Sequence, residues 1–310
     1  MRTFLTISHE QQPSAVALGF FDGVHMGHRK VLGGAAAQRS NGLTPVCLTF
    51  SQSPKSIISD FDTPFLMTRA DKLKALEAIG IEHVYFADFR SVMHLSARDF
   101  FAEILVKTLN AKALFCGFNY RFGWKAEGDI KLLQRLCVEH GVRLVVAPPQ
   151  TDNGEVVCST LIKRLISDGN IERANRLLCG RFGIREIIRS GRRLGRSMGT
   201  PTLNQQLTKG LTQPKLGVYA SIVTLESGKT FCGVTNIGIR PTVGGGDPLW
   251  ETWMPEYSGG EIYGQTADVR LLKFLRPEQK FDSLADLRDA ILRDGEQAKA
   301  VFRQIGESAT

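Results

Sequence analysis

The sequence lacks several features by which common classes of protein are recognised. It contains no apolar run of about 18 residues, the length that a membrane-spanning helix requires. Its first residues, MRTFLTIS, lack the continuous apolar segment of a secretory signal peptide. The six cysteines include no C-x-x-C pair, which argues against the usual zinc and redox motifs and favours free thiols. We therefore expect a cytoplasmic protein with no membrane partner.

The charge is basic, but no nucleic-acid-binding motif accompanies it. Lys and Arg total 39 against 31 Asp and Glu, so the formal net charge is +8. Such a balance is compatible with nucleic acid, a membrane surface or small phosphorylated ligands. The densest basic segment, residues 181–196, has no lysine-aromatic pattern, helix-turn-helix or zinc-finger signature. We expect small phosphorylated molecules as partners and no nucleic acid.

The N-terminal part of the chain alternates short β-rich runs with segments of helical periodicity. This alternation predicts an α/β fold with a Rossmann-like, doubly wound parallel sheet, which binds its ligands at the carboxyl ends of the strands. A further helical pair is predicted over 160–167 and 171–178. Strands are predicted over 14–20, 45–50, 83–87, 113–117 and 143–148, and helices over 28–40, 69–79, 96–109 and 129–140.

The pattern changes after about residue 180. Residues 184–276 consist of short strands and turns, including a hairpin formed by 217–225 and 229–236. Such spacing predicts a small antiparallel barrel or sandwich. A terminal helix is predicted from residue 284 to about 302, with Ser283 as its N-cap. We expect two domains, residues 1–182 and 183–310.

The segment GFFDGVHMGH, residues 19–28, directly follows the first predicted strand. If a helix begins near His25, its first backbone N–H groups have no partner inside the helix and attract an anion. His25 and His28 share a helix face, and Gly27 lets the backbone approach a phosphate closely. Nucleotidyl transfer needs such donors and no covalent nucleophile. A metal site formed by Asp22, His25 and His28 is the alternative interpretation.

A second candidate site is CSTLIK, residues 158–163, which opens a predicted helix. It places the hydroxyls of Ser159 and Thr160 at a helix N-terminus and the Lys163 cation one turn later. This arrangement suits a triphosphate, although Ser or Thr before a helix is usually only a cap. Its co-occurrence with residues 19–28 favours the phosphate interpretation.

Together these segments resemble a known family. Residues 19–28, 117–123 and 159–163 resemble, in order, three signatures of the adenylyltransferase module of bacterial bifunctional riboflavin kinase/FAD synthetase. The second half resembles the riboflavin kinase module of the same family, and the resemblance covers nearly the whole chain. Its ordered segments there are 194–204, 217–220, 233–243, 262–264 and 275–281.

The resemblance implies two reactions in sequence. ATP phosphorylates riboflavin to FMN in the C-terminal module, which has a riboflavin kinase-like barrel. ATP then adenylylates FMN to FAD in the N-terminal module, with release of pyrophosphate. It further implies that His25 and His28 are catalytic in the second reaction. The residues implied to bind ATP and its phosphates there are Gly19, Phe20, Asp22, Gly23, His25, Gly27, His28, Asn119, Arg121, Ser159, Thr160 and Lys163.

The kinase module must hold phosphates without a P-loop, because no G-x-x-x-x-G-K-S/T segment is present. The Thr202 hydroxyl and the Asn204 amide are hard oxygen ligands that suit Mg²⁺. Phosphoryl transfer also needs a base to receive the hydroxyl proton, and the resemblance implies that Glu251 is this base. The other residues implied to bind ATP or flavin are Gly195, Arg196, Gly199, Pro201 and Arg276.

The sequence departs from the family pattern at several positions. Lys163 stands where an arginine is usual, Leu203 lies between the two proposed magnesium ligands, and Trp253 replaces a histidine two residues after Glu251. Lys163 keeps the charge of arginine but loses its bidentate fork. Neither Leu203 nor Trp253 removes a proposed chemical group, so we expect both activities. Two alternatives stay open: one working module, the adenylyltransferase before the kinase, or a non-catalytic protein that binds flavin or nucleic acid.

Overall fold

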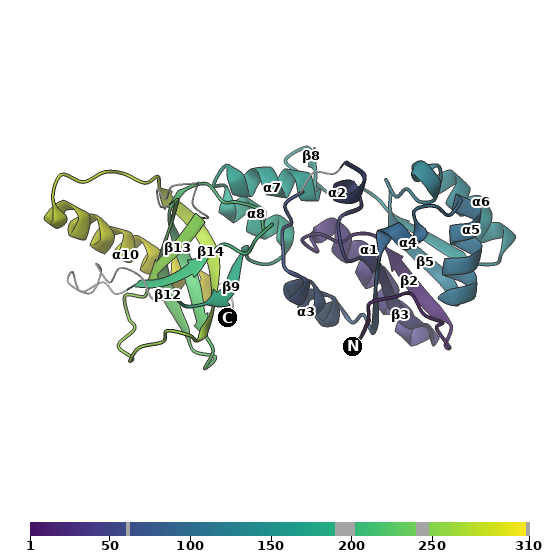
Figure 1. Ribbon diagram of the computed structural model, residues 1–310, viewed down its shortest axis with the longest axis horizontal. Helices are drawn as coiled ribbons and strands as arrows, with labels where there is room; N and C mark the ends of the chain where they lie inside the picture. Colours follow the sequence, from purple (N-terminus) through teal and green to yellow (C-terminus); the bar gives the residue numbers. More distant parts are fainter. Residues whose placement is uncertain (60–62, 190–201, 240–247, 308–310) are drawn as a thin grey trace. The chain divides into compact units, whose positions relative to one another are not determined.

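The computed structural model describes residues 1–59, 63–189, 202–239 and 248–307. The chain forms two compact units, Met1–Ser159 and Thr160–Thr310. The first is an α/β unit and the second contains an antiparallel barrel with a long terminal helix (Figure 1). This agrees with the fold class predicted from the sequence.

The first unit contains a six-stranded sheet in which every pairing is parallel. The strand order β1-β4-β3-β2-β5-β6 places β2 between β3 and β5, and all five residues of β2 are buried. A strand buried on both faces is typical of doubly wound sheets. The strands are β1 (Arg2–Phe4), β2 (Ser14–Leu18), β3 (Thr44–Phe50), β4 (His83–Ala87), β5 (Ala111–Gly117) and β6 (Arg143–Ala147).

Helices cover both faces of this sheet. Helices α1 (Met26–Ala36) and α3 (Arg69–Ile79) share one apolar cluster, in which Leu32 and Leu76 are fully buried. The cluster on the other face includes residues of α6 (Ile130–Glu139). Short elements complete the unit: 3-10 helices Ala37–Asn41 and Trp124–Ala126, α2 (Pro54–Ser59), α4 (Phe89–Val92), β7 (Thr151–Asp152) and β8 (Glu155–Val156).

The helix predicted over 96–109 has an unusual internal geometry. A short α-helix, α5 (Ala97–Asp99), continues as a π-helix over Phe100–Thr108, and the N–H of Leu109 donates to the carbonyl oxygen of Ile104 at 2.9 Å. The apolar residues of this segment still reach the core, where Phe101 and Leu105 are fully buried. Apolar periodicity locates such an element but does not distinguish its turns from those of an α-helix.

The second unit contains a six-stranded antiparallel sheet of order β10-β13-β12-β11-β14-β9. An antiparallel bridge between Arg189 and Asn204 joins the two edges of this sheet and nearly closes a barrel. The strands are β9 (Gly183–Ile187), β10 (Thr202–Gln206), β11 (Gly217–Leu225), β12 (Thr230–Ile239), β13 (Pro248–Trp253) and β14 (Thr266–Arg276).

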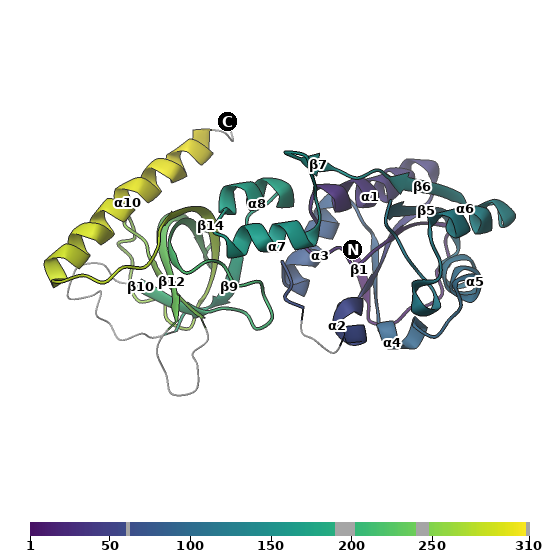
Figure 2. The same ribbon diagram turned by 90° about the horizontal axis from the view of Figure 1, so that it is seen from above.

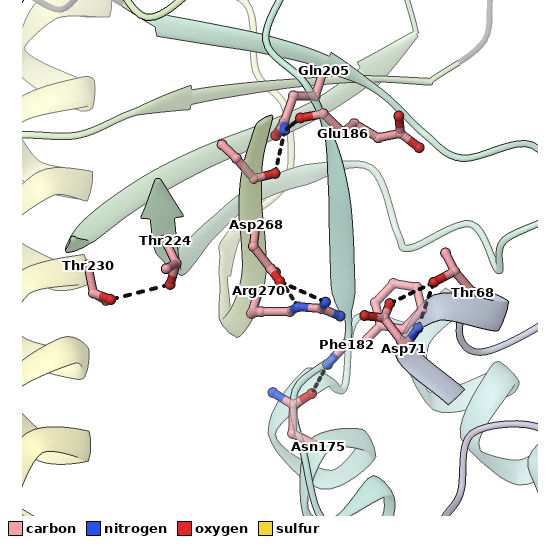
Figure 3. Close-up of polar contacts among 11 residues, drawn as sticks. Thr68, Asp71, Asn175, Phe182, Glu186, Gln205, Thr224, Thr230, Asp268 and Arg270 are labelled. Atoms are coloured by element: carbon pink, nitrogen blue, oxygen red, sulfur yellow. Dashed lines mark hydrogen bonds and ion pairs between the residues drawn. The ribbon is translucent and has the colours of Figure 1, made fainter. Parts of the chain in front are cut away.

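Polar side chains inside the barrel connect strands that are distant in sequence. The Gln205 amide donates to the carbonyl oxygens of Glu186 at 2.6 Å and Ala267 at 2.8 Å (Figure 3). These bonds link β10 to β9 and β14 across the join of the barrel. Because buried polar groups are costly unless they are hydrogen-bonded, such contacts specify which strands become neighbours.

Helix α10 (Leu284–Glu307) packs on the outside of the barrel. Ser283 caps it, since its Oγ accepts the N–H of Asp286 at 3.1 Å, as the sequence predicted. The apolar cluster beneath the helix contains Val218, Ala220, Cys232, Val234, Leu272 and Ala298.

The helical pair α7 (Ser159–Ser167) and α8 (Ile171–Leu178) lies on the side of the barrel opposite α10 (Figures 1 and 2). The Asn175 amide donates to the carbonyl oxygen of Leu271 at 2.8 Å. It also accepts the N–H of Phe182 at 2.8 Å (Figure 3). Helix α8 therefore packs with the barrel, although the sequence analysis placed it in the N-terminal domain. The expected boundary between residues 182 and 183 separates the parts of the chain that carry the two activities, and it stays a prediction.

Candidate active sites

Residues 19–25 form the predicted turn between β2 and α1. His25 is the N-cap of α1, and its Nδ1 accepts the N–H of His28 at 3.4 Å. Because Nδ1 acts as an acceptor, a neutral His25 carries its proton on Nε2. The turn lies at the carboxyl edge of the parallel sheet, where the N-terminus of α1 can attract an anion.

The backbone of this turn adopts left-handed conformations at residues other than glycine. Phe21 has φ 54° and Val24 has φ 40°, and Gly23 has φ 87°. The left-handed region is strongly disfavoured for a β-branched residue such as Val24. Conformations of this kind persist only where the surrounding structure fixes them.

Side chains from three other segments hold the turn in place. The carbonyl oxygen of Phe20 accepts hydrogen bonds from Thr49 Oγ1 at 2.9 Å and from Lys72 Nζ at 2.7 Å. The Asp22 carbonyl oxygen accepts a bond from Ser159 Oγ at 2.9 Å. The Asp22 carboxylate in turn accepts the N–H of Leu66 at 2.7 Å. These bonds fix the peptide groups that follow Phe20 and Asp22.

The two histidines stack on each other, with ring centroids 3.6 Å apart. Burial lowers the pKa of His25 to about 4, although the Asp22 carboxylate acts in the opposite direction. Burial also lowers the pKa of His28 well below its usual value, and His25 and Lys72 add to this effect. Both rings are neutral at pH 7 and each keeps one N–H. His28 Nδ1 has no hydrogen-bond partner among the described residues.

The geometry does not support the metal interpretation of this segment. Within the described parts of the chain, no three His, Cys, Asp or Glu side chains are grouped in a way that could hold a metal ion. One oxygen of the Asp22 carboxylate is engaged by the backbone of Leu66. The contacts of Asp22 are those of a residue that orders the turn.

Two glycines of the motif lie close to neighbouring rings, which a side chain at either position would crowd. A Cβ on Gly19 would lie 2.9 Å from Cζ of Phe21, which is buried against His28. A Cβ on Gly27 would lie 3.2 Å from the His25 ring. Gly27 therefore provides space for the stacked histidines as well as for the close approach of a ligand.

The predicted residues Asn119 and Arg121 lie on the loop that follows β5, and both are exposed. Strand β5 is a parallel neighbour of β2, so this loop and the turn leave the sheet at the same edge. Ser159 contacts the turn directly through Asp22. Thr160 is exposed and Lys163 is half-buried on α7, and both belong to the second compact unit.

Thr49 and Lys72 also belong to this site, although neither lies in a predicted motif. Both are buried and both donate to Phe20. A signal was present for Lys72, because it lies on the buried face of the predicted helix 69–79, one turn before Leu76. A lysine on the apolar face of a helix needs a partner, but periodicity does not say which one.

In the barrel, the three principal predicted residues are brought together by strand pairing. Thr202 and Asn204 lie two residues apart on β10, and Glu251 lies on β13. Asn204 is directly opposite Glu251, which is also opposite Asn236 of β12. Directly opposed residues point to the same face of a sheet. Asn204, Glu251 and Asn236 therefore form a polar row across three strands.

Asn236 and Glu278 also lie near this row, and neither was predicted as a site residue. Asn236 Nδ2 donates to Glu278 Oε1 at 3.2 Å. Both lie within segments of the family resemblance, 233–243 and 275–281, but nothing in those segments distinguishes the two positions. Only the register of β12 against β13 places Asn236 beside the predicted base.

The two departures in the barrel have packing explanations. Successive side chains of a strand point to opposite faces, so Leu203 lies on the face opposite to Thr202 and Asn204. Leu203 is 4% exposed and faces the barrel interior. Trp253 packs against α10, where a Cβ on Gly295 would lie 2.8 Å from its ring. Leu203 therefore packs inside the barrel and Trp253 packs between the barrel and α10, both next to the polar row.

Arg276, predicted to bind ATP or flavin, makes a bidentate ion pair with Asp294 of α10. Its Nη2 lies 2.7 Å from Asp294 Oδ2, and its Nε lies 3.1 Å from both carboxylate oxygens. Asp294 is 4% exposed, so this contact fastens the terminal helix to the end of β14. The predicted residues Gly195, Arg196, Gly199 and Pro201 lie outside the described residues.

Comparison with known proteins assigns the two halves of the chain to two families. Residues 7–161 match the FAD synthetase family and residues 178–302 match the riboflavin kinase family. The chain is 34% identical to a bifunctional riboflavin kinase/FMN adenylyltransferase of Escherichia coli (strain K12), with 94% of each chain covered. It is 30% identical to the protein of the same description from Bacillus subtilis (strain 168), with 96% of each covered.

A solved structure also resembles the chain over nearly its full length. This structure, described as a macrolide-efflux protein from Streptococcus pneumoniae, has a TM-score of 0.89 and 29% identity, covering 96% of this chain and 99% of that one. Across the described ranges of the present chain, no helix has the length and apolar character needed to cross a membrane.

Proposed function

The chain belongs to the family of bifunctional riboflavin kinase/FMN adenylyltransferases, and from this premise we propose which of its residues act in the two reactions. The enzyme transfers phosphate from ATP to riboflavin to form FMN, and then transfers an adenylyl group from a second ATP to FMN to form FAD. The observation that carries the proposal is that each half positions a polar cluster suited to its reaction: the turn at His25 and His28, and the row at Glu251.

In the adenylyltransferase half, the turn and the N-terminus of α1 receive the phosphates of ATP. A phosphate oxygen of FMN attacks the α-phosphorus, and pyrophosphate leaves. Negative charge on the phosphate oxygens then increases, and the N–H groups of the neutral His25 and His28 stabilise it. Asn119, Arg121 and Ser159 of the first unit complete the proposed phosphate-binding set there. The family resemblance adds Thr160 and Lys163 as proposed ATP-binding residues.

In the kinase half, Glu251 accepts the proton of the riboflavin hydroxyl as the hydroxyl oxygen attacks the γ-phosphorus of ATP. The bond to the β,γ-bridging oxygen breaks and ADP leaves. Its neighbours support this role. Asn204 and Asn236 flank it on both sides, and amide side chains can orient a carboxylate by hydrogen bonding. Glu251 is half-buried, so a substrate hydroxyl can reach it.

The residues present fit a magnesium ion. The Thr202 hydroxyl, the Asn204 amide oxygen and the Glu251 carboxylate share one face of β10 and β13, and all are hard oxygen donors. Asn204 Nδ2 lies 3.4 Å from the carbonyl oxygen of Thr202, which assigns the amide nitrogen to the backbone. We propose Thr202 and Asn204 as the protein ligands. When bound, the cation neutralises part of the charge of the ATP phosphates.

Incubation of the purified protein with riboflavin, ATP and Mg²⁺, followed by separation of the flavins, tests the function. We expect FMN and then FAD, and the absence of both would refute the proposal. FAD formed from supplied FMN, with no product from riboflavin, would instead indicate a single working module. RNA retention with a steep salt dependence and no turnover would favour a non-catalytic binding protein. The cytoplasmic location expected from the sequence stays a prediction.

A further inference from the structure

Lys72 of α3 is a buried cation that none of the predicted motifs includes. It is 6% exposed, and its Nζ donates to the carbonyl oxygen of Phe20 at 2.7 Å. The ammonium group also lies 4.3 Å from the centroid of the Phe20 ring. Removing a charged amine from water is costly, so its position must be stabilised by these contacts.

The carbonyl oxygen that Lys72 binds belongs to the turn before α1. Thr49 Oγ1, at the end of β3, donates to the same oxygen at 2.9 Å. In a trans peptide the carbonyl and the next N–H point in opposite directions. The two donors that hold the Phe20 carbonyl therefore direct the N–H of Phe21 away from Lys72. The peptide group that they hold comes directly before the left-handed segment that includes Phe21 and Val24.

We infer that Lys72 is a positioning residue for the adenylyltransferase reaction, because its ammonium group holds the phosphate-binding turn in the geometry that presents the N-terminus of α1 and His28 to ATP. This inference rests on the proposed role of the turn. Lys72 contacts the site through the backbone of Phe20, and its positive charge also adds to the potential at the helix N-terminus.

The charges around Lys72 make this contribution sensitive to pH. Burial lowers its pKa to about 8, Arg69 of the same helix acts in the same direction, and Asp22 and Cys47 oppose them. His28 of α1 also faces Lys72 and is neutral at pH 7. Lys72 is therefore charged below about pH 8 and loses its charge above it.

Lys72→Met tests the inference, because methionine keeps an unbranched apolar side chain and removes the charge and the donor. Lys74→Met is the matched control: it makes the same change on the same helix at an exposed position. We expect Lys72→Met to raise the KM for ATP in FAD formation about tenfold, as expected for loss of a charged hydrogen bond, with a smaller change in kcat. Riboflavin phosphorylation by the same preparation should be unchanged, and Lys74→Met should match the wild type in both reactions.

The pH dependence distinguishes positioning from simple packing. For the wild type, kcat/KM for ATP in FAD formation should fall as the pH rises through about 8, while Lys72→Met should lack this step. A KM for ATP equal to that of the wild type, or the same alkaline step in the variant, would overturn the inference. If the wild type formed no FAD from FMN, the proposed function would fail instead.

A second variant tests whether the Phe20 carbonyl controls the turn if Lys72→Met does not fold. Thr49→Val removes the other donor to Phe20 with little change in shape and leaves the lysine in place. We expect the KM for ATP to rise about threefold to tenfold with kinase activity unchanged, because the same carbonyl is less firmly held. An unchanged KM in a folded Thr49→Val variant would count against control of the turn through this carbonyl.

Discussion

Glu251 lies directly opposite Asn204 across the antiparallel pairing of β13 with β10. The two side chains share one face of the barrel, and Thr202 follows on the same face of β10. A proposed base and the proposed magnesium ligands are thereby adjacent. The spacing of 47 residues between Asn204 and Glu251 in the sequence gives no indication of this contact.

Glu251→Gln should abolish FMN formation and leave adenylylation of supplied FMN intact. Glutamine keeps the shape of the side chain but cannot accept the hydroxyl proton. General base catalysis contributes about 10²- to 10⁴-fold, so the rate should fall by that factor. Flavin products from riboflavin and from FMN, separated by chromatography, measure the two activities. Normal turnover of riboflavin by the variant would show that Glu251 is not the base.

His28→Ala should have the converse effect. The variant loses a neutral N–H donor at the phosphate-binding turn, and loss of one such donor costs about 10²- to 10³-fold in rate. FAD formation from FMN should fall by that factor, while riboflavin phosphorylation continues at its normal rate. Equal loss of both activities would indicate unfolding in place of a local catalytic defect.

The stability of the first unit should decrease as the pH falls from about 6.5 to about 4. The pKa of His25 is lowered from 6.5 to about 4, so the unfolded chain binds a proton in this window that the folded chain does not. Stability then falls with decreasing pH, by about 1.4 kcal/mol per pH unit for one such group. His28 acts in the same direction. Urea unfolding at pH 7, 6 and 5 measures the effect, and His25→Asn should reduce the slope.

Arg276→Met should destabilise the second unit, because it leaves the buried Asp294 carboxylate without its bidentate partner. Breaking a buried pair on one side costs about 3 to 5 kcal/mol. The double variant Arg276→Met with Asp294→Leu removes both charges and should recover most of this loss. Urea unfolding of the wild type and the two variants measures the cost. A double variant with restored stability but a raised KM for ATP or riboflavin would support the predicted ligand-binding role of Arg276.

Much of the fold follows from local signals in the sequence. The helix predicted over 69–79 has these bounds in the structure, and β4 occupies the predicted 83–87. The helix predicted to begin near His25 does so, because the histidine caps it and the preceding glycine-rich turn ends β2. Such features depend on residues a few positions apart, which periodicity and capping rules describe well.

Other features depend on contacts between distant segments and could not be predicted. The roles of Lys72 and Thr49 arise because α3 and β3 converge on one backbone carbonyl, and no motif specifies that convergence. The packing of Trp253 is likewise set by a distant segment, because its ring lies against Gly295 of α10.

Apolar periodicity, turn residues and ordered motifs are local properties of the chain, so they predict the two-part architecture, the family and the identity of the chemical groups. How these groups are held depends on contacts between distant segments. The neutral state of His25 and His28 follows from burial, the row through Asn204 and Glu251 from strand register, and the pairing of Arg276 from the docking of α10. Each of these three features depends on which segments pack against each other, and this packing forms only in the folded chain.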